Sequence, residues 1–269
     1  MGEIVGALIV THTPRIANEA TAPEFTREMI RGMHELDGVV ARLRPDVIVQ
    51  SSTHWVTTFN HYALSHKRHK GVLTSSEAPD IIAGMPYDFP GDPELAEAIA
   101  AKANEAGAPT IASAAEPFML EYGTVNPIQY LTPKFDVPVV PLSCCLMANI
   151  AECLRFGEAV GAAIRASARR AVVVASGALS HKLVRGPSTW PKDEDQKLDH
   201  QFIDMVTHGR AKEIKSFFPS FCKTTQAEMG GRHVAMLLGA TGGTFKGKLH
   251  AYGPSSGTGN PVVSLLPAS

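Results

Sequence analysis

Three stretches of the chain share one pattern of apolar and polar positions. Residues 3–12, 46–54 and 170–181 each begin as an apolar, largely β-branched run, pass into small or hydroxylated residues and end at a histidine: His12, His54 and His181. Such a run predicts a buried strand, and its polar end predicts the carboxyl edge, where α/β sheets carry their chemistry. A single histidine there is equally typical of an ordinary hydrogen-bonded residue, but the matching contexts favour a shared site.

Amphipathic spacing predicts helices between these strands. Apolar residues recur every three or four positions over residues 23–43, and Pro23 stands near the expected helix start. Strand, helix, strand is thus the opening unit, and a crossover of this length suits parallel strands. The loops after His12 and His54 should therefore lie at one edge of the sheet.

The remaining periodic segments continue the alternation. We expect helices at 94–107, 153–169, 193–206, 212–220 and after Gln226, a strand at 137–143, and a glycine-rich turn from Ala251 that leads into a closing strand. No repeat or linker marks a second domain. The prediction is one α/β domain over residues 1–269, with a mixed central β-sheet flanked by helices.

Residues 60–93 lose this periodicity and accumulate Gly, Pro, His and charged residues. We expect a long loop-rich insertion, of the kind that often forms a lid or a binding segment. Its histidines, His61, His66 and His69, stand beside Lys67, Arg68 and Lys70, which favours a solvated basic turn. Arg68 or Lys70 could bind a substrate carboxylate.

Composition narrows the partners. With 269 residues, 44% of them hydrophobic, and a net charge of −1, the chain can bury a large core and lacks the basic surface that nucleic acid or an acidic membrane would need. No stretch approaches the ~18 apolar residues of a membrane span, and we find no signal peptide. No cysteine pair has CxxC spacing, so buried free thiols in a reducing cytoplasm are expected. Small molecules and other protein chains remain as partners.

Two imidazoles and one carboxylate can hold a metal ion and leave adjacent positions open. His12, His54 and Glu228 can supply this set, and Glu228 is the only acidic residue from Ile214 to the C-terminus. The arrangement is that of non-haem Fe(II) oxygenases, although His₂Glu with water is also a zinc arrangement, and ligand types alone do not choose. His181 is then free to act as a base, or it simply caps a strand. His233 is interpreted as packing near Glu228 rather than as a ligand.

These motifs together resemble the class III (LigB-type) extradiol ring-cleavage dioxygenases. The matching pieces, over almost the whole length, are Thr11-His-Thr-Pro14, Ser51-Ser-Thr-His-Trp55, Ser176-Gly-Ala-Leu-Ser-His181, Glu228 before an apolar helix, and Tyr252-Gly-Pro254. The resemblance implies an Fe(II) enzyme that inserts O₂ into an aromatic ring beside a hydroxyl. It implies His12, His54 and Glu228 as ligands and His181 as the acid–base residue.

The resemblance also bears on the substrate and on assembly. Catechol-cleaving members commonly carry Asp-His-Gly where this chain has Glu121-Tyr122-Gly123, so Tyr122 argues against a catechol. Tyr122 and Thr13 are expected to contact the ring. The C-terminal Tyr252–Gly259 stretch looks like the 2-aminophenol 1,6-dioxygenase branch, in which a subunit without metal ligands pairs with an active one. This chain keeps its histidines, so we expect the catalytic kind, in a homo-oligomer or with a related subunit; a metal-free partner subunit and a zinc hydrolase are the alternatives.

Overall fold

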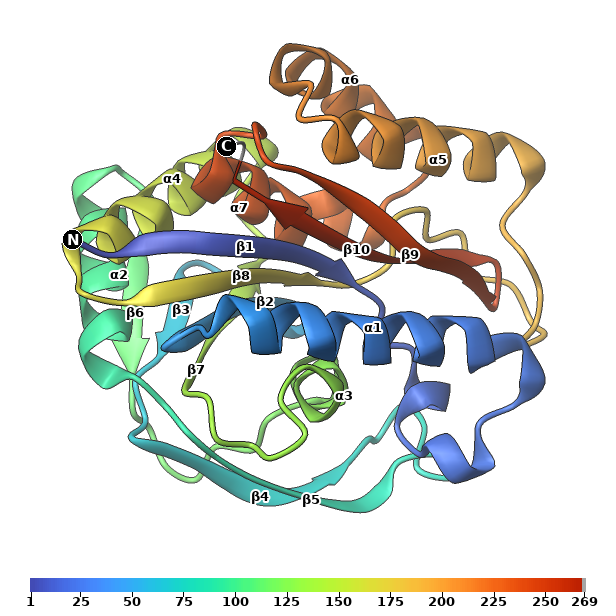
Figure 1. Ribbon diagram of the computed structural model, residues 1–269, viewed down its shortest axis with the longest axis horizontal. Helices are drawn as coiled ribbons and strands as arrows, with labels where there is room; N and C mark the ends of the chain where they lie inside the picture. Colours follow the sequence, from blue (N-terminus) through green and yellow to red (C-terminus); the bar gives the residue numbers. More distant parts are fainter. Residues whose placement is uncertain (268–269) are drawn as a thin grey trace.

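The central sheet determines where every candidate residue lies. The structure, a computed structural model, describes residues 1–267 and places eight strands of that range in one sheet (Figure 1). In spatial order they are β6 (Thr110–Ser113), β3 (His61–Leu64), β7 (Val139–Cys145), β2 (Val47–Thr57), β8 (Arg170–Ser176), β1 (Glu3–Val10), β10 (Thr258–Leu266) and β9 (Lys246–Ser255).

The middle of the sheet is parallel, and antiparallel pairs appear toward both margins, although β6 pairs in parallel with β3 at one end. β8 pairs in parallel with β2 on one side and β1 on the other, and β2 pairs in parallel with β7. β10 runs antiparallel to β1 and to β9, and β3 runs antiparallel to β7. The predicted mixed sheet is confirmed. The three strands that the sequence pattern singled out are direct neighbours, so their carboxyl ends meet at one edge.

Helices cover both faces of this sheet (Figure 1). One face packs against α1 (Arg27–Leu43), α3 (Tyr122–Leu131) and the ribbon of β4 (Arg68–Thr74) and β5 (Ala83–Pro90), and the other against α2 (Pro93–Glu105), α4 (Ile150–Ala166), α5 (Asp193–Thr207), α6 (Ala211–Thr224) and α7 (Arg232–Thr241). Alternate residues of β1 serve the two cores: Leu8 and Val10 face the first, Ala7 and Ile9 the second. This is why the strand reads as one continuous apolar run.

Short 3₁₀ turns complete the described chain: η1 (Pro14–Ile16), η2 (Glu19–Thr21), η3 (Glu24–Thr26) and η4 (Glu228–Gly231). The first predicted helix begins at Arg27 because η3 precedes it, and it ends at Leu43 because the next residue, Arg44, has a left-handed φ of 47°. The helix α3 was not predicted. Pro127 lies inside it, and Glu121 caps its start by accepting a hydrogen bond from the Thr124 amide.

The prediction of a loop-rich insertion at residues 60–93 is wrong. The segment contains β3, β4 and β5, and β4 alternates buried and exposed positions. One buried position of β4 is a histidine rather than an apolar residue, so the sequence does not show the alternation of apolar and polar residues that predicts a strand. His69 is buried, and its Nε2 lies 3.1 Å from the Val139 carbonyl oxygen. His61 and His66 are buried as well, so the solvated basic turn is also wrong. Arg68 and Lys70 both pair with Asp88 at the surface.

Three smaller features of the fold bear on what the sequence predicted. The expected C-terminal glycine-rich turn is shorter than predicted, because β9 continues to Ser255 and only Ser256 and Gly257 separate it from β10. The cysteines, Cys144, Cys145, Cys153 and Cys222, are free and buried, as expected. Within residues 1–267 no helix is both long and apolar enough to cross a membrane.

Candidate metal centre

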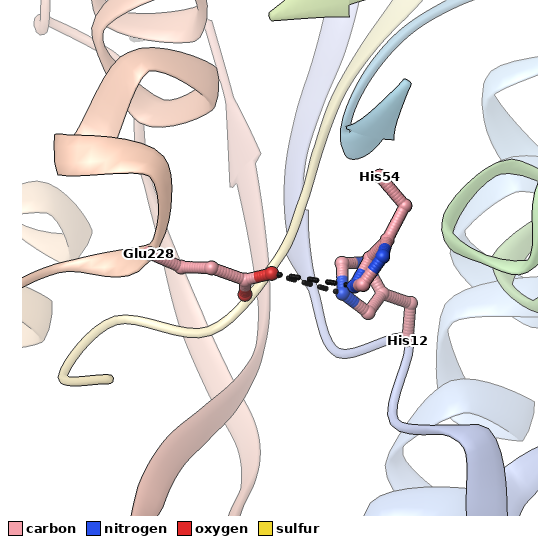
Figure 2. Close-up of side chains that lie close together, drawn as sticks. All are labelled: His12, His54 and Glu228. Carbon is pink, nitrogen blue, oxygen red and sulfur yellow. Dashed lines mark ion pairs between the residues drawn. The ribbon is translucent and has the colours of Figure 1, made fainter. Parts of the chain in front are cut away.

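His12, His54 and Glu228 converge at the carboxyl edge of the parallel strands (Figure 2). One potential ligand atom from each lies within 4.8 Å of the others. Glu228 Oε1 is 3.4 Å from His12 Nε2 and 3.6 Å from His54 Nε2, so both imidazoles face the same carboxylate oxygen. Residues 216 positions apart in sequence, counted from 228 minus 12, thus form one cluster.

The tautomer of His12 follows from its neighbours. His12 Nδ1 lies 2.8 Å from Ser176 Oγ, and Ser176 Oγ donates its own hydrogen to the Gly123 carbonyl oxygen at 2.6 Å. Because the serine has one hydrogen, it must accept from His12, whose Nδ1 is therefore the N–H donor. The lone pair of neutral His12 is left on Nε2, the atom that faces Glu228.

Gly123 is required for this arrangement. A Cβ at this position would stand 2.4 Å from Ser52 Oγ and 3.1 Å from His12 Nδ1. The start of α3 therefore packs against the ligand side chains at a distance that only glycine allows.

A bulge in β2 delivers His54. Ser51 pairs with Leu142 of β7 and Val56 pairs with Cys144, so three extra residues of β2 leave the ladder between these points. The strand continues past His54 to Thr57, rather than ending near it as the sequence suggested. The bulge turns Thr53 toward the site, where Thr53 Oγ1 donates to Glu228 Oε1 at 2.5 Å.

His54 has a second set of partners at the open side of the site. Its Nδ1 lies 3.4 Å from Glu77 Oε1, and its Nε2 lies 2.6 Å from the Tyr122 hydroxyl. Tyr122 has one hydroxyl hydrogen, which it can donate either to His54 Nε2 or to Glu77 Oε2, 3.1 Å away. A carboxylate that accepts from Nδ1–H orients the ring with Nε2 toward Glu228. Burial raises the pKa of Tyr122 and nearby Glu77 raises it further, so the phenol stays protonated.

Glu228 reaches the site from a sharply bent turn. Met229, Gly230 and Gly231 all have positive φ, so the chain is kinked within η4, between α6 and α7. Gly231 could not be replaced without strain, since a Cβ would also lie 2.4 Å from Cys222 Sγ. The second carboxylate oxygen of Glu228 accepts from the Ala178 amide at 2.5 Å.

The electrostatics of the three residues differ. Burial alone would raise the pKa of Glu228, but the charge and hydrogen bond of His12 outweigh it, and the pKa is lowered well below its usual value. Burial would lower the pKa of His12, but Glu228 outweighs that effect and raises it. Burial, followed by the charge of His12, lowers the pKa of His54 to about 4. The site pairs one buried anion with one basic and one neutral imidazole.

The donor set fits a metal ion. A buried carboxylate is expensive unless a cation or hydrogen bonds compensate it, and here two imidazole nitrogens face the oxygen that accepts from Thr53. Imidazole and carboxylate ligands of this kind hold first-row divalent metals, and their identity does not select iron over zinc.

The other predicted residues lie around this cluster. His181 follows β8, forms an isolated bridge with Thr258, and is near enough for its charge to help lower the pKa of Glu228. Thr13 is buried beside His12, with its hydroxyl 2.8 Å from Ser255 Oγ. His233 is fully buried in α7, and a Cβ on Gly177 would stand 2.6 Å from its Nε2, which agrees with a packing residue.

Three residues in contact with the cluster were not predicted. Thr53 and Ser176 lie within the histidine-containing motifs 51–55 and 176–181, and their hydroxyl groups at the polar end of each buried run were the available signal. Glu77 lies between β4 and β5, in the segment whose strands were missed, so nothing in the sequence pattern connected it to His54.

Comparison with known proteins places this site in a family. Residues 6–263 match the family described as the catalytic LigB subunit of aromatic ring-opening dioxygenase. The chain belongs to the LigB family. The resemblance seen in the sequence is thereby confirmed, as is the prediction that the protein is a ring-cleaving dioxygenase enzyme.

Similar LigB-type proteins cover nearly the same length. The 3,4-dihydroxyphenylacetate 2,3-dioxygenase of Escherichia coli is 27% identical over 266 residues, which cover 95% of this chain and 96% of that protein. The beta subunit of 2-aminophenol 1,6-dioxygenase from a Pseudomonas species is 27% identical over 286 residues, covering 97% and 93%. The alpha subunit of the same enzyme is 27% identical over 229 residues, covering 82% and 84%.

A solved structure shares the LigB-type fold. The crystal structure of an uncharacterized protein from Escherichia coli K12 superposes with a TM-score of 0.69 at 19% identity, covering 97% of this chain and 99% of that one. The likeness supports the fold described above.

Proposed function

We propose that this LigB-family chain, as one catalytic domain over residues 1–269, is a non-haem Fe(II)-dependent extradiol dioxygenase. Its substrates are aromatic rings with adjacent hydroxyl/hydroxyl or hydroxyl/amino groups, of catechol, aminophenol or dihydroxypyridine type. The observation that carries the proposal is the convergence of His12 Nε2, His54 Nε2 and Glu228 Oε1, with His12 Nδ1 engaged by Ser176.

Each residue has a defined task in this proposal. His12, His54 and Glu228 would hold Fe(II), which when bound supplies adjacent positions for the two ring donors and for O₂ and lets electrons pass between them. Tyr122 borders this position through His54 and stays protonated. With a ring bound, its hydroxyl hydrogen would turn from His54 or Glu77 to a substrate oxygen. Thr13, beside His12, contacts the ring. His181 takes the hydroxyl or amine proton from the bound ring and returns it to the product.

The overall reaction balances as one ring plus one O₂. The carbon–carbon bond next to a donor-bearing carbon breaks, both oxygen atoms remain in the opened product, O₂ is reduced and the ring is oxidised. Tyr122, where catechol-cleaving members commonly have histidine, argues against a catechol among these substrate classes.

Oxygen uptake by Fe(II)-loaded protein against a panel of catechols, 2-aminophenols and dihydroxypyridines tests the proposal. We expect uptake of one O₂ per ring with one class and none in the metal-free protein. Protein purified anaerobically with Fe(II) should contain one iron per chain. Activity that persists without O₂, or with zinc alone, would identify the zinc hydrolase instead.

A metal-free partner subunit is the second alternative. It predicts no stoichiometric metal after anaerobic loading and activity only when a related subunit is added. The matches to both subunits of the 2-aminophenol enzyme motivate this test, because this chain resembles each at 27% identity.

We infer a cytoplasmic homo-oligomer, or a hetero-oligomer with a related subunit, and size measurement of the purified protein alone decides between them.

The role of His181 is tested separately from metal binding. Because it does not belong to the three-residue cluster, His181→Ala should keep the iron and bind the ring, while kcat falls by roughly 10²–10⁴, the usual contribution of general acid–base catalysis. Loss of iron as readily as in His54→Ala would make His181 a ligand. Turnover at the parent rate would make it structural.

A further inference from the structure

The two residues on either side of His181 are both held by α5. Ser180 donates from its amide and its hydroxyl to Asp199, at 3.0 Å and 2.6 Å. Lys182 Nζ lies 2.7 Å from Asp195 Oδ1. Asp195 and Asp199 are four residues apart, hence on one face of the helix, and both are almost completely buried.

We propose that Asp199, with Asp195, positions the imidazole of His181 for its proton transfers. Asp199 does not touch the metal cluster in the described chain, so it would act through the Ser180–Lys182 segment, as a positioning residue. The inference rests on the proposed acid–base role of His181.

The backbone of residues 178–181 is bonded to Glu228 and to the residues near it. The Ala178 amide donates to Glu228 Oε2, the Leu179 carbonyl accepts from the Glu228 amide, and the His181 amide donates to the Thr225 carbonyl. Each residue of this short segment is thus bonded to a neighbouring element. The segment connects the proposed ligand Glu228 to the proposed acid–base residue His181. The position of Ser180 therefore helps to set the distance between these two side chains.

Tyr252 and Gly259 complete the binding of Asp199. The Tyr252 hydroxyl donates to Asp199 Oδ2 at 2.6 Å, which gives the carboxylate three donors. A Cβ on Gly259 would stand 2.0 Å from the same oxygen, so the carboxylate fits directly against the β10 backbone. The Tyr252-Gly-Pro stretch that the sequence singled out thereby acquires a task that metal binding does not explain.

Burying the Asp199 carboxyl group costs free energy that an apolar side chain at this position would not cost. Burial raises the pKa of Asp199 to about 7 although the three donors oppose it, so the fold accepts a desolvated acid at this position. A buried polar network specifies one arrangement of its members when every member is satisfied. Here the arrangement specified is that of the residue preceding His181.

Asp199→Asn tests the inference, and Asp193→Asn is its matched control, because Asp193 is exposed at the start of the same helix. We expect Asp199→Asn to keep one metal per chain and to bind 4-nitrocatechol, a coloured ring with adjacent hydroxyls, within about twofold of the parent. Its kcat should fall roughly 10- to 100-fold, the scale of a misplaced catalytic group. Tyr252→Phe, which removes one donor without burying a new group, should give a smaller loss of the same kind.

Combination with His181→Ala separates this inference from the proposed function. If Asp199 acts through His181, Asp199→Asn should lower kcat in the parent and leave kcat of His181→Ala unchanged. An equal loss in both backgrounds, or loss of metal or ring binding in Asp199→Asn with Tyr252→Phe at the parent rate, overturns the inference.

A measurement without turnover covers the case in which His181→Ala keeps the parent rate. The imidazole carbon–proton NMR signal of His181 in Zn(II)-loaded protein, assigned by its loss in His181→Ala, should shift or broaden in Asp199→Asn and stay in place in Asp193→Asn. An unchanged signal in Asp199→Asn overturns the inference, whatever the role of His181 is.

Discussion

The two sides of the candidate metal site differ in burial. On one side His12 and Glu228 are each 5% exposed, and their partners Ser176 and Thr53 are buried in β8 and β2. On the other side the His54 side chain is 20% exposed, and its partner Glu77 is 62% exposed. The sheet itself builds the first side, whereas the second depends on a residue between β4 and β5.

The pKa values of the three residues differ between the two sides. In the buried side the attraction of His12 and Glu228 overcomes desolvation in both, so the pKa of His12 is raised and that of Glu228 lowered. In the open side nothing overcomes it, and the pKa of His54 falls to about 4. The charge therefore resides where water is excluded, and a neutral imidazole with Tyr122 lies on the other side of the site. Substitutions on the two sides should differ in size accordingly.

Glu228→Gln should have the largest effect. It keeps the shape of the side chain but removes the one charge that both imidazoles face. Metal content and activity should fall together to background, beyond the roughly 10- to 100-fold loss in metal affinity seen when an outer partner is removed. Metal analysis and oxygen uptake measure both quantities, and Glu152→Gln, which lies 3.4 Å from His61 instead, is the control. A variant that retains metal at the parent affinity would exclude Glu228 as a ligand.

Ser176→Ala tests the buried side from outside the ligand set. Its hydroxyl fixes Nδ1 of His12 as the donor, and without it the ring loses both its tautomer and its orientation. We expect metal affinity to fall roughly 10- to 100-fold. Ser264→Ala is the matched control, because Ser264 Oγ also lies 2.8 Å from a histidine nitrogen, that of His250 on the far strand β9. Equal losses in the two variants would show a general packing effect.

The sequence predicted the buried side better than the open side, for a physical reason. A strand buried on both faces leaves a continuous apolar signal, so β1, β2 and β8 and the histidines at or after their polar ends were visible. Glu228 stood out as the only acid of its region. The open side depends on Glu77, and β4 hides its alternation behind a buried histidine and exposed valine. A bulge such as that in β2 shifts register without a sequence signal of its own.

The pH dependence of metal binding should report the buried side. The raised pKa of His12 means that, in the metal-free protein, this ring holds its second proton more tightly than an ordinary histidine does, and a metal ion must displace that proton. His54, with a pKa of about 4, has no proton to release near neutrality. Metal affinity should therefore rise with pH, by at most about tenfold per unit for one proton, until His12 is deprotonated.

Stability of the metal-free protein should show the opposite sign for the same group. Because the pKa of His12 is raised by folding, protonated His12 adds to the free energy of unfolding below its unfolded-state pKa, and this contribution is lost as pH rises through the folded-state pKa. Because the pKa of Glu228 is lowered by folding, its carboxylate adds to the free energy of unfolding above its unfolded-state pKa, and this contribution is lost as pH falls through the folded-state pKa. Zinc titrations at about pH 6 and about pH 8, with a proton-sensitive dye, measure the metal affinity and the number of protons released per ion bound. Release of two protons per ion at pH 6, or equal affinity at both values, would contradict the division between His12 and His54.

Glu77→Gln should have the smallest effect and is the sharpest test of the comparison. The residue orients His54 from a mostly exposed position, at 3.4 Å from Nδ1, and exposed ion pairs are worth roughly 0.2–1 kcal/mol, so metal affinity should fall by no more than about fivefold. Glu116→Gln is matched to it, since Glu116 is 70% exposed and 3.6 Å from His66 Nδ1, away from the three ligands. High salt should reduce the effect of Glu77→Gln and leave that of Ser176→Ala unchanged, because salt screens exposed charges far more than buried groups. A loss in Glu77→Gln as large as that in Ser176→Ala, and insensitive to salt, would mean that substrate-side closure buries this carboxylate and that both sides hold the metal equally.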